Sequence, residues 1–513
     1  MISDASRAQP TSAERLLRGL ARNPAARVDV LLGVLRTAPL PACQGLEARR
    51  DLPRPLQDVM VEHPLRDVRS VLAEHPGVDP GIRGRLLLAD PDWRVVVRAF
   101  GSPDQQPLSD HVLHSLLARI EDVPPEALVT VPELYAELWP AMRYDLRLYR
   151  LAAKHPDPRV RRHAAAFPRY LDDSSRGALM ADPVPEIREV IVAAIAEEQR
   201  VMQPADLPDH HCHGFWAVLQ RPLSRALVDR IVASGDEAAL YFVGPNPSTP
   251  PDVVQALLRH SAAEVRRRLA ERIDLSREQL LLLACDSVVE VRTAVSVNPG
   301  LTEQQRADID IDVTTVGGDG HYGPRRRCRH HDHAFVDERV PPLADAMRWA
   351  SSVNPLLRRR AARNPELPSS LVTSLADDPD LGVRVLLALH HPDAPSGHLL
   401  RCFLEYHGCG REQLTELARF PTAGVAVFAD HTDPAVRRLA VRDPQADPEL
   451  VEQLLCDPDI TVRQATASCR RLPHARITAL LGDPELAEHA AANPALPVEQ
   501  MRRILESAPV PEA

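Results

Sequence analysis

The sequence predicts an all-α fold: a superhelical α-solenoid of about sixteen repeats of about 26 residues each. A Val-Arg pair recurs at nearly constant spacing, a proline follows the valine after eight residues, and an amphipathic run then leads to the next Asp-Pro. The composition agrees with this prediction. Aromatic residues make up only 4% of the 513 residues, and the 49 prolines suit the boundaries of many short helices.

The clearest repeat runs from His431 to Pro458 and is followed at once by another copy. Val436 and Val462 occupy the same position in the two copies, and 462 − 436 gives the step of 26 residues. The same position is filled along the chain by Val68, Val95, Val160, Ile187, Val265, Val291, Leu357, Val383, Val436 and Val462. Two degenerate copies, near Gly214 and Ala239, fill the longest gap between these residues.

Each repeat predicts two helices. The aspartate of Asp-Pro is expected to accept backbone N–H groups at the start of the first helix, and proline suits the first helical position. Val436, Leu439 and Ala440 then share one face of that helix, which is short enough to be α or 3-10. A second proline ends it, and a Leu-rich amphipathic run forms the second helix. Helices this short are not stable alone, so neighbouring repeats must bury them.

The motif Val-Arg-x-x-Ala, followed by Asn-Pro-x-Leu-Pro-x-x-Leu-Leu-x-x-Leu, is best seen at Leu357–Asp380 and Val436–Asp459. It resembles the leucine-rich repeat variant family, a bacterial relative of HEAT and armadillo arrays. The resemblance extends from about Leu16 to Leu505. It implies a curved, right-handed solenoid in which α and 3-10 helices alternate, and it says almost nothing about function.

Departures from the repeat divide the chain into five expected segments. Residues 1–118, 151–307 and 348–513 are the N-terminal, central and C-terminal repeats. In residues 119–150 the motif gives way to a degenerate stretch with the aromatic residues Tyr135, Trp139, Tyr144 and Tyr149. Residues 308–347 form an insertion rich in Gly, Arg and His, which we expect to leave the solenoid as a loop.

Charge and composition exclude several classes of protein. The net charge of −10, from 61 basic and 71 acidic residues, is not that of a basic nucleic-acid-binding protein. No apolar run is long enough to span a membrane, and no secretory signal opens the sequence. The eight cysteines include no Cys-x-x-Cys pair. We therefore expect a soluble, reduced, cytoplasmic protein without a membrane partner.

The arginine after the repeat valine is the first candidate for function. It recurs as Arg69, Arg161, Arg188, Arg266, Arg292, Arg358, Arg384, Arg437 and Arg463. Such a ladder could grip phosphates or an acidic partner. The favoured interpretation is structural: each arginine pairs with an aspartate of its own or a neighbouring repeat, such as the one four residues before it, namely Asp157, Asp380, Asp433 or Asp459.

A second arginine follows the ladder residue in several repeats and is expected to be exposed. These residues, Arg162, Arg267, Arg359 and Arg438, are candidate binding residues together with Arg325, Arg326, Arg327 and Arg329 of the insertion.

Two clusters have the side chains that zinc prefers. They are His210, His211, Cys212 and His213 in a degenerate repeat, and Cys328, His330, His331 and His333 in the insertion. Neither spacing matches a closed zinc motif, although two ligands from each could form one site. A solvated His-rich loop is the favoured interpretation. We expect no other cofactor and predict no catalytic residue, since the sequence has no nucleophile elbow and no phosphate-binding GK[ST].

These observations favour a non-enzymatic scaffold that binds a protein or peptide on its concave face, as repeat arrays offer extended surfaces. One alternative is a nucleic-acid-binding solenoid that uses the arginine ladder and the Arg325–Arg329 loop. The other is a zinc-type metal-binding protein built on the two His/Cys clusters.

Overall fold

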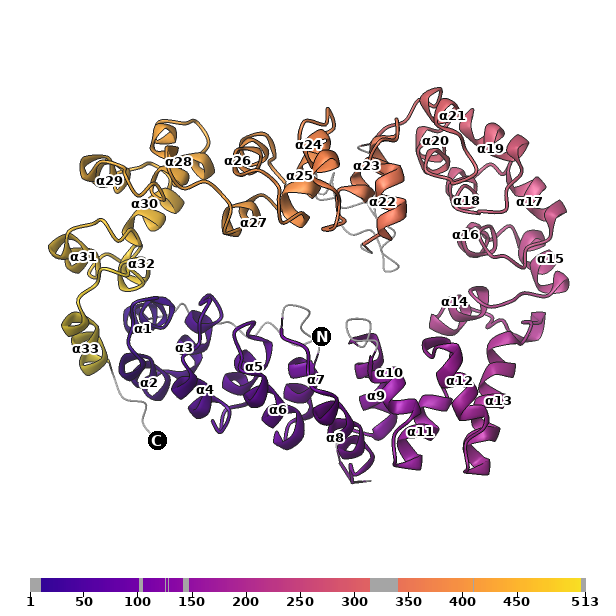
Figure 1. Ribbon diagram of the computed structural model, residues 1–513, viewed down its shortest axis with the longest axis horizontal. Coiled ribbons are helices and arrows are strands. Elements are labelled where there is room, and N and C mark those ends of the chain that lie inside the picture. The colour runs from indigo at the N-terminus through magenta and orange to yellow at the C-terminus, as the bar shows by residue number, and fades with distance from the viewer. Residues whose placement is uncertain are drawn as a thin grey trace. The chain divides into compact units, whose positions relative to one another are not determined.

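The computed structural model describes residues 11–100, 105–124, 126–127, 129–141, 147–313, 340–408 and 410–508. These residues form 33 α-helices and three short 3-10 helices (Figure 1). Within these ranges the only β-type pairing is an isolated bridge between Met202 and Leu223. The predicted all-α class is confirmed, and successive helix pairs stack side by side as an α-solenoid requires.

The chain divides into two compact parts, residues 1–196 with 422–513 and residues 197–421, and within each part the first helices of the repeats form one layer. They are α1 (Ser12–Arg22), α3 (Pro39–Leu46), α5 (Arg66–Glu74), α7 (Trp93–Phe100), α9 (Val131–Ala141), α11 (Pro158–Ala165), α13 (Pro185–Gln199), α14 (His213–Leu219), α16 (Glu237–Val243), α18 (Ala263–Leu269), α20 (Val289–Ser296), α23 (Pro355–Ala361), α25 (Leu381–His390), α27 (Arg411–Glu416), α28 (Pro434–Ala440), α30 (Ile460–Ala467) and α32 (Ala487–Ala491).

The second helices form the other layer. They are α2 (Val28–Thr37), α4 (Arg54–Met60), α6 (Pro80–Ala89), α8 (Asp110–Glu121), α10 (Arg147–Ala153), α12 (Asp173–Met180), α15 (Arg225–Ser234), α17 (Pro251–Leu257), α19 (Arg277–Ala284), α21 (Glu303–Ala307), α22 (Leu343–Trp349), α24 (Ser369–Ala376), α26 (Ser396–Glu405), α29 (Pro448–Leu454), α31 (His474–Leu480) and α33 (Val498–Ser507). The 3-10 helices are η2 (Pro168–Tyr170), η3 (Pro204–Asp206) and η4 (Val425–Phe428).

The first segments of the repeats are α-helical in the described residues. The alternation of α and 3-10 helices that the family resemblance implies is not observed there. Aspartate caps the first helix as expected in several repeats: the side chain of Asp157 accepts the Arg159 N–H at 2.8 Å, and that of Asp433 accepts the Ala435 N–H at 2.9 Å.

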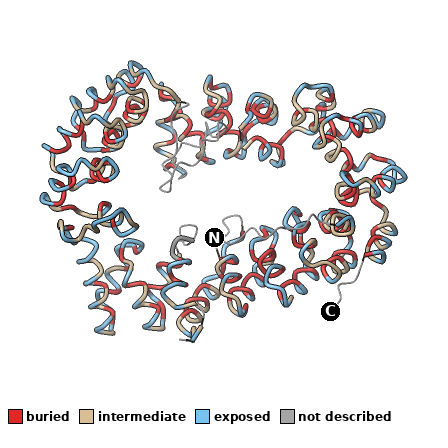
Figure 2. Tube along the Cα trace, turned by 180° about the vertical axis from the view of Figure 1, so that it is seen from behind, coloured by how far each residue is buried: buried red, intermediate tan, exposed pale blue. Residues whose placement is uncertain are grey.

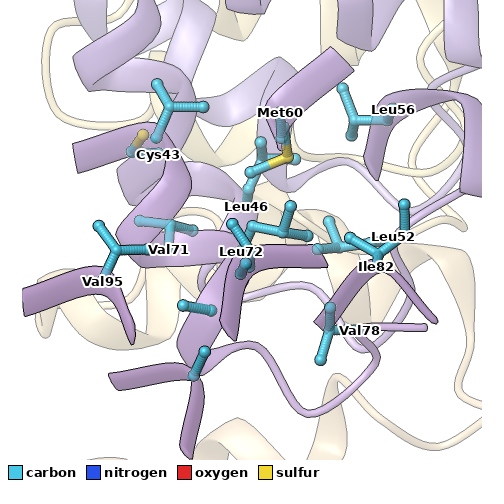
Figure 3. Packing of buried hydrophobic residues seen from close by; sticks show 14 of the residues in the cluster. Cys43, Leu46, Leu52, Leu56, Met60, Val71, Leu72, Val78, Ile82 and Val95 are labelled. Carbon is cyan, nitrogen blue, oxygen red and sulfur yellow. The ribbon is translucent and has the colours of Figure 1, made fainter. Parts of the chain in front are cut away.

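The core lies between the two layers. Figure 3 shows it for α3 to α7, where Leu46 and Leu72 of the first helices meet Met60 and Ile82 of the second helices. All four side chains are almost fully buried. Buried residues follow the sides of the helices that face their neighbours (Figure 2). Each repeat therefore depends on the adjacent repeats for its burial.

The first helices pack against each other more closely than the second helices do, for example α1 on α3 compared with α2 on α4. Each such pair of repeats is therefore wedge-shaped, and locally the stack bends toward the first-helix layer.

The chain divides into two compact units. Unit 1 contains residues 1–196 together with 422–513, and unit 2 contains residues 197–421. The degenerate stretch 119–150 belongs to unit 1, and it continues the two layers with α9, which packs on α7, and α10, which packs on α8 and α12. In the insertion, residues 314–339 lie outside the described ranges. The five segments expected from the sequence remain a prediction.

Unit 1 joins the two ends of the chain. α1 packs on α32, and α2 packs on α33, as though the first repeat followed the last. The Arg18 guanidinium lies 3.3 Å from the Glu488 carboxylate, and that of Arg502 lies 3.1 Å from the Asp29 carboxylate. Gly19 sits so close to α32 that a Cβ atom there would lie 2.2 Å from the Glu488 carbonyl oxygen. The helices of unit 1 thus run as one stack from α28 through α33 into α1.

None of the helices in the described part of the chain combines the length and the hydropathy that a membrane-spanning segment needs.

Candidate functional site

The recurrent arginine ties each repeat to the next one. Arg437 binds both carboxylate oxygens of Asp457, at 2.8 and 2.7 Å, and also donates to the carbonyl oxygens of His431 and Thr432. Only 13% and 6% of the Arg437 and Asp457 side chains are exposed. The pairs built in the same way are Arg69–Asp90, Arg161–Asp182, Arg266–Asp286, Arg358–Asp378 and Arg437–Asp457.

The structural interpretation of the ladder is confirmed, but the partner proposed from the sequence spacing is wrong. Asp157 and Asp433, four residues before their arginines, cap the first helices instead. The true partner lies 20 or 21 residues after the arginine, at the Asp-Pro boundary of the next repeat. Hydrogen bonds from Arg161 and Arg437 hold the pKa values of Asp182 and Asp457 below their usual range.

The other ladder arginines are also engaged. Arg463 donates to the carbonyl oxygens of Asp457 and Pro458 and pairs with Glu485 at 2.8 Å. Arg384 pairs with Glu405. Arg188 donates to the carbonyl oxygens of two residues at its own repeat boundary, and Arg292 pairs with Asp310 at 2.9 Å. These guanidinium groups are occupied within the array, so the ladder gives no support to phosphate binding.

A second ladder runs along the turns between the first and second helices. Asn298 donates its side-chain amide to the carbonyl oxygens of Ala270 and Arg272 in the preceding repeat, at 3.0 and 2.7 Å. Asn246 does the same to Leu219 and Arg221. This explains the recurrent Asn-Pro of the sequence: proline ends the helix, and the buried asparagine satisfies carbonyl groups that the end of the previous first helix leaves without partners.

The second arginine of the repeat does not behave uniformly. Arg162 is exposed. Arg267 is half-buried and pairs with Glu264 at 2.8 Å, and Arg438 is half-buried as well. Arg359 contradicts the expected exposure: only 4% of the residue is exposed, and it pairs with Asp380 at 2.7 Å, because an aspartate stands opposite it in the next repeat. The candidate residues Arg325, Arg326, Arg327 and Arg329 lie outside the described residues.

The first His/Cys cluster does not form a group of three or more metal-binding side chains among the residues that the structure describes. His210 and His213 are exposed, Cys212 is half-buried, and His211 bonds through Nε2 to the Asp236 carboxylate at 2.7 Å. No group of three or more His, Cys, Asp or Glu side chains suited to a metal occurs in the described ranges. The second cluster, Cys328, His330, His331 and His333, lies outside them. A zinc site shared by the two clusters remains a prediction.

His211 instead belongs to an aromatic surface that the sequence did not predict. Its ring lies 4.8 Å from that of Trp216 on α14, and Trp216 lies 5.0 Å from Phe242 on α16. The neighbouring ring of Tyr241 is covered by the Arg268 guanidinium of α18 at 4.5 Å. We call Trp216, Tyr241, Phe242 and Arg268 the aromatic stripe, which crosses three successive first helices of unit 2.

The stripe residues are half-buried, so part of each ring contacts solvent. Ala239 and Val243 of α16 are buried. Tyr241 therefore lies on the side of α16 away from the core, whereas Phe242 and Trp216 are partly buried and pack against the core. A partial sequence signal existed: Trp216 and Tyr241 each stand two residues after the repeat position, at Gly214 and Ala239, whereas Arg268 stands three residues after Val265.

The aromatic residues of the degenerate stretch serve mainly in packing. Tyr135 and Tyr149 are buried, and Tyr149 stacks on Tyr170 with 5.1 Å between ring centres. The side chains of Trp139 and Tyr144 are outside the described part of the chain.

Comparisons with known proteins do not identify the chain. No family model and no curated protein matches it. Among solved structures, it is similar to Kap121p in the crystal structure of Kap121p bound to Ste12p, at 12% sequence identity and a TM-score of 0.21. The match covers 97% of this chain and 52% of that one, so the chain spans about half the length of that relative. The fold assignment rests on the helices and their packing, and the resemblance to the leucine-rich repeat variant family is not confirmed.

Proposed function

We propose that the protein is a non-enzymatic scaffold that binds a protein or peptide partner on the first-helix layer, and that the aromatic stripe of unit 2 is its main contact surface. The single observation that carries this proposal is the row of half-buried rings on α14 and α16, which ends at Arg268 on α18. Tryptophan, tyrosine and arginine are enriched where protein interfaces gain most of their binding energy.

The local structure supports a preformed surface. The rings stand on short helices held by buried residues, and the Asp236 carboxylate, which caps α16, also anchors His211 against Trp216. A partner would therefore meet rings that are already ordered, which lowers the entropy cost of binding. The first-helix layer is also the side toward which the stack bends locally, so a peptide could contact several repeats at once.

The charge pattern disfavours nucleic acid as the partner of this surface. Arg267 and Arg268 pair with Glu264 and Glu271, so the cations beside the rings are balanced by carboxylates. Binding of single-stranded nucleic acid combines stacking with cations that contact phosphates. We propose a partner with apolar or aromatic anchor side chains instead.

Selection of peptides from a random library on the full chain, followed by fluorescence anisotropy, tests the proposal. The double variant Trp216→Ala/Phe242→Ala should weaken the selected peptides at least about tenfold. The matched control is Ile273→Ala, which removes an 82% exposed apolar side chain outside the stripe and should leave affinity unchanged. Equal thermal unfolding of the variants would show that the fold is intact. Peptides that bind the double variant as tightly as the parent would contradict the proposal.

A further inference from the structure

A small cavity lies in unit 1, where the degenerate stretch meets the central repeats. Its volume is about 220 Å³, and it opens between α9, α11 and α13. The lining residues are Pro132, Tyr135, Arg162, His163, Ala166, Phe167 and Val190. Apart from Arg162 and the ring nitrogens of His163, the walls are apolar side chains or ring faces.

One wall of the cavity is fixed by a buried hydrogen bond. Tyr135, which is only 1% exposed, stacks on His163 with 4.4 Å between ring centres and an angle of 23° between ring planes. The Tyr135 hydroxyl donates to Oε1 of Glu121 at 2.8 Å, and His163 Nε2 lies 3.6 Å from the same oxygen. The stacked pair is therefore a preformed aromatic wall that another ring can contact.

Arg162 supplies the charge at this cavity. Its guanidinium is exposed and forms no hydrogen bond or ion pair with any residue that the structure describes. Arg267 occupies the same position of its own repeat, but Glu264 holds it at 2.8 Å and Glu271 lies 3.8 Å away. An arginine without an acidic partner, beside an apolar cavity, matches a ligand that has a carboxylate and an apolar body.

We propose that this cavity binds a small carboxylic acid with a single aromatic ring, the ring packing against the Tyr135–His163 pair and the carboxylate pairing with Arg162. The size fits, since an apolar cavity of about 150 Å³ accommodates benzene. Burial and the charge of Arg162 lower the pKa of His163, and burial raises the pKa of Glu121 behind the wall.

This site is independent of the aromatic stripe, which belongs to unit 2. Titration of the full chain with phenylacetate, followed by ligand-observed NMR and calorimetry, tests it. Phenylacetate should bind saturably below about 10 mM. Phenylacetamide, which lacks the charge, should bind at least about tenfold more weakly. Arg162→Gln should weaken phenylacetate by a similar factor, and Val190→Phe, which fills the cavity, should abolish binding.

The matched control is Arg267→Gln, which removes an arginine at the same repeat position and should leave phenylacetate affinity unchanged. Thermal unfolding of each variant would verify the fold. The proposal is overturned if phenylacetate does not saturate the protein, if phenylacetamide binds equally well, or if Arg162→Gln and Arg267→Gln have equal effects.

Discussion

Asn23, near the start of the chain, donates its side-chain amide to the backbone carbonyl of Asn493, near the end, at 2.7 Å. A second bond reaches the carbonyl of Ala491 at 2.8 Å. Asn493 makes the same two contacts with Ala467 and Cys469, at 2.8 and 2.7 Å. The asparagine contacts in the turns between first and second helices therefore continue from the last repeat to the first with the same geometry. Arg49, which donates to the Asn23 carbonyl, continues them.

This continuity predicts that Asn23 contributes as much to stability as an asparagine inside the array. Asn23 and Asn493 are both fully buried. Each Asn→Ala substitution should lower the free energy of unfolding by about 2–4 kcal/mol, because it leaves two buried carbonyl groups without donors. Urea unfolding of the two variants measures this. If the first repeat were a free end, Asn23→Ala would cost no more than an exposed substitution, within about 0.5 kcal/mol.

Replacing two helical glycines by alanine should change the stability of the protein in opposite directions. A Cβ at Gly19 would clash with the Glu488 carbonyl and lie 2.7 Å from the Ala491 Cβ, so Gly19→Ala should destabilise unit 1 by separating α1 from α32. At Gly177 on α12 nothing lies within 4 Å, so Gly177→Ala should stabilise by about 0.5–1 kcal/mol through helix propensity. Melting temperatures of the two variants test the contrast, and a stabilising Gly19→Ala would contradict the close contact of the chain ends.

The arginine ladder predicts that two aspartates near Arg437 differ in importance. Asp457→Ala leaves a mostly buried guanidinium unpaired and should cost about 2–4 kcal/mol. Asp433→Ala removes the cap of α28 and should cost about 1 kcal/mol. A double-mutant cycle with Arg437→Gln should show strong coupling to Asp457 and weak coupling to Asp433. Stronger coupling of Arg437 to Asp433 than to Asp457 would mean that the partner expected from the sequence spacing is the correct one.

Acid should break the ion pairs Arg161–Asp182 and Arg437–Asp457 by protonating the aspartates. The pKa values of Asp182 and Asp457 are lowered in the folded state, so their contribution to stability is full above the ordinary aspartate pKa and is lost as the pH falls through the lowered value. The free energy of unfolding should therefore fall below about pH 4. Asp457→Asn should be clearly less stable than the parent at pH 7, and the difference should shrink toward about pH 2. A difference that does not depend on pH would show that the Asp457 charge is unimportant.

The regular part of the fold was predictable because residues within each repeat mark the boundaries of its helices. Val436 and Leu439 set the buried face, and the prolines mark where helices start or stop. The partner of Arg437 was not predictable from local spacing. Stacking brings Asp457 of the next repeat to 2.7 Å from the guanidinium, whereas Asp433, which is nearer in sequence, caps α28.

The candidate sites were harder to predict because they depend on contacts between repeats. The residues next to His211 in the sequence suggested that it binds a metal. In the structure its partner is Asp236, 25 residues further along the chain. Closure of the chain ends left a trace in the sequence at Gly19 of α1, because any larger residue would clash there with the Glu488 carbonyl of α32.

A circular permutant tests the closure of unit 1 most directly. Joining Ala513 to Met1 keeps residues 509–513 and 1–10 as the linker, and the chain is opened within residues 314–339. Because α33 and α1 already stack as neighbouring repeats, the permutant should fold with an unchanged or higher melting temperature and the same helical circular dichroism. A permutant that loses helical signal, or melts about 10 °C or more below the parent, would contradict the account that the last repeat packs on the first.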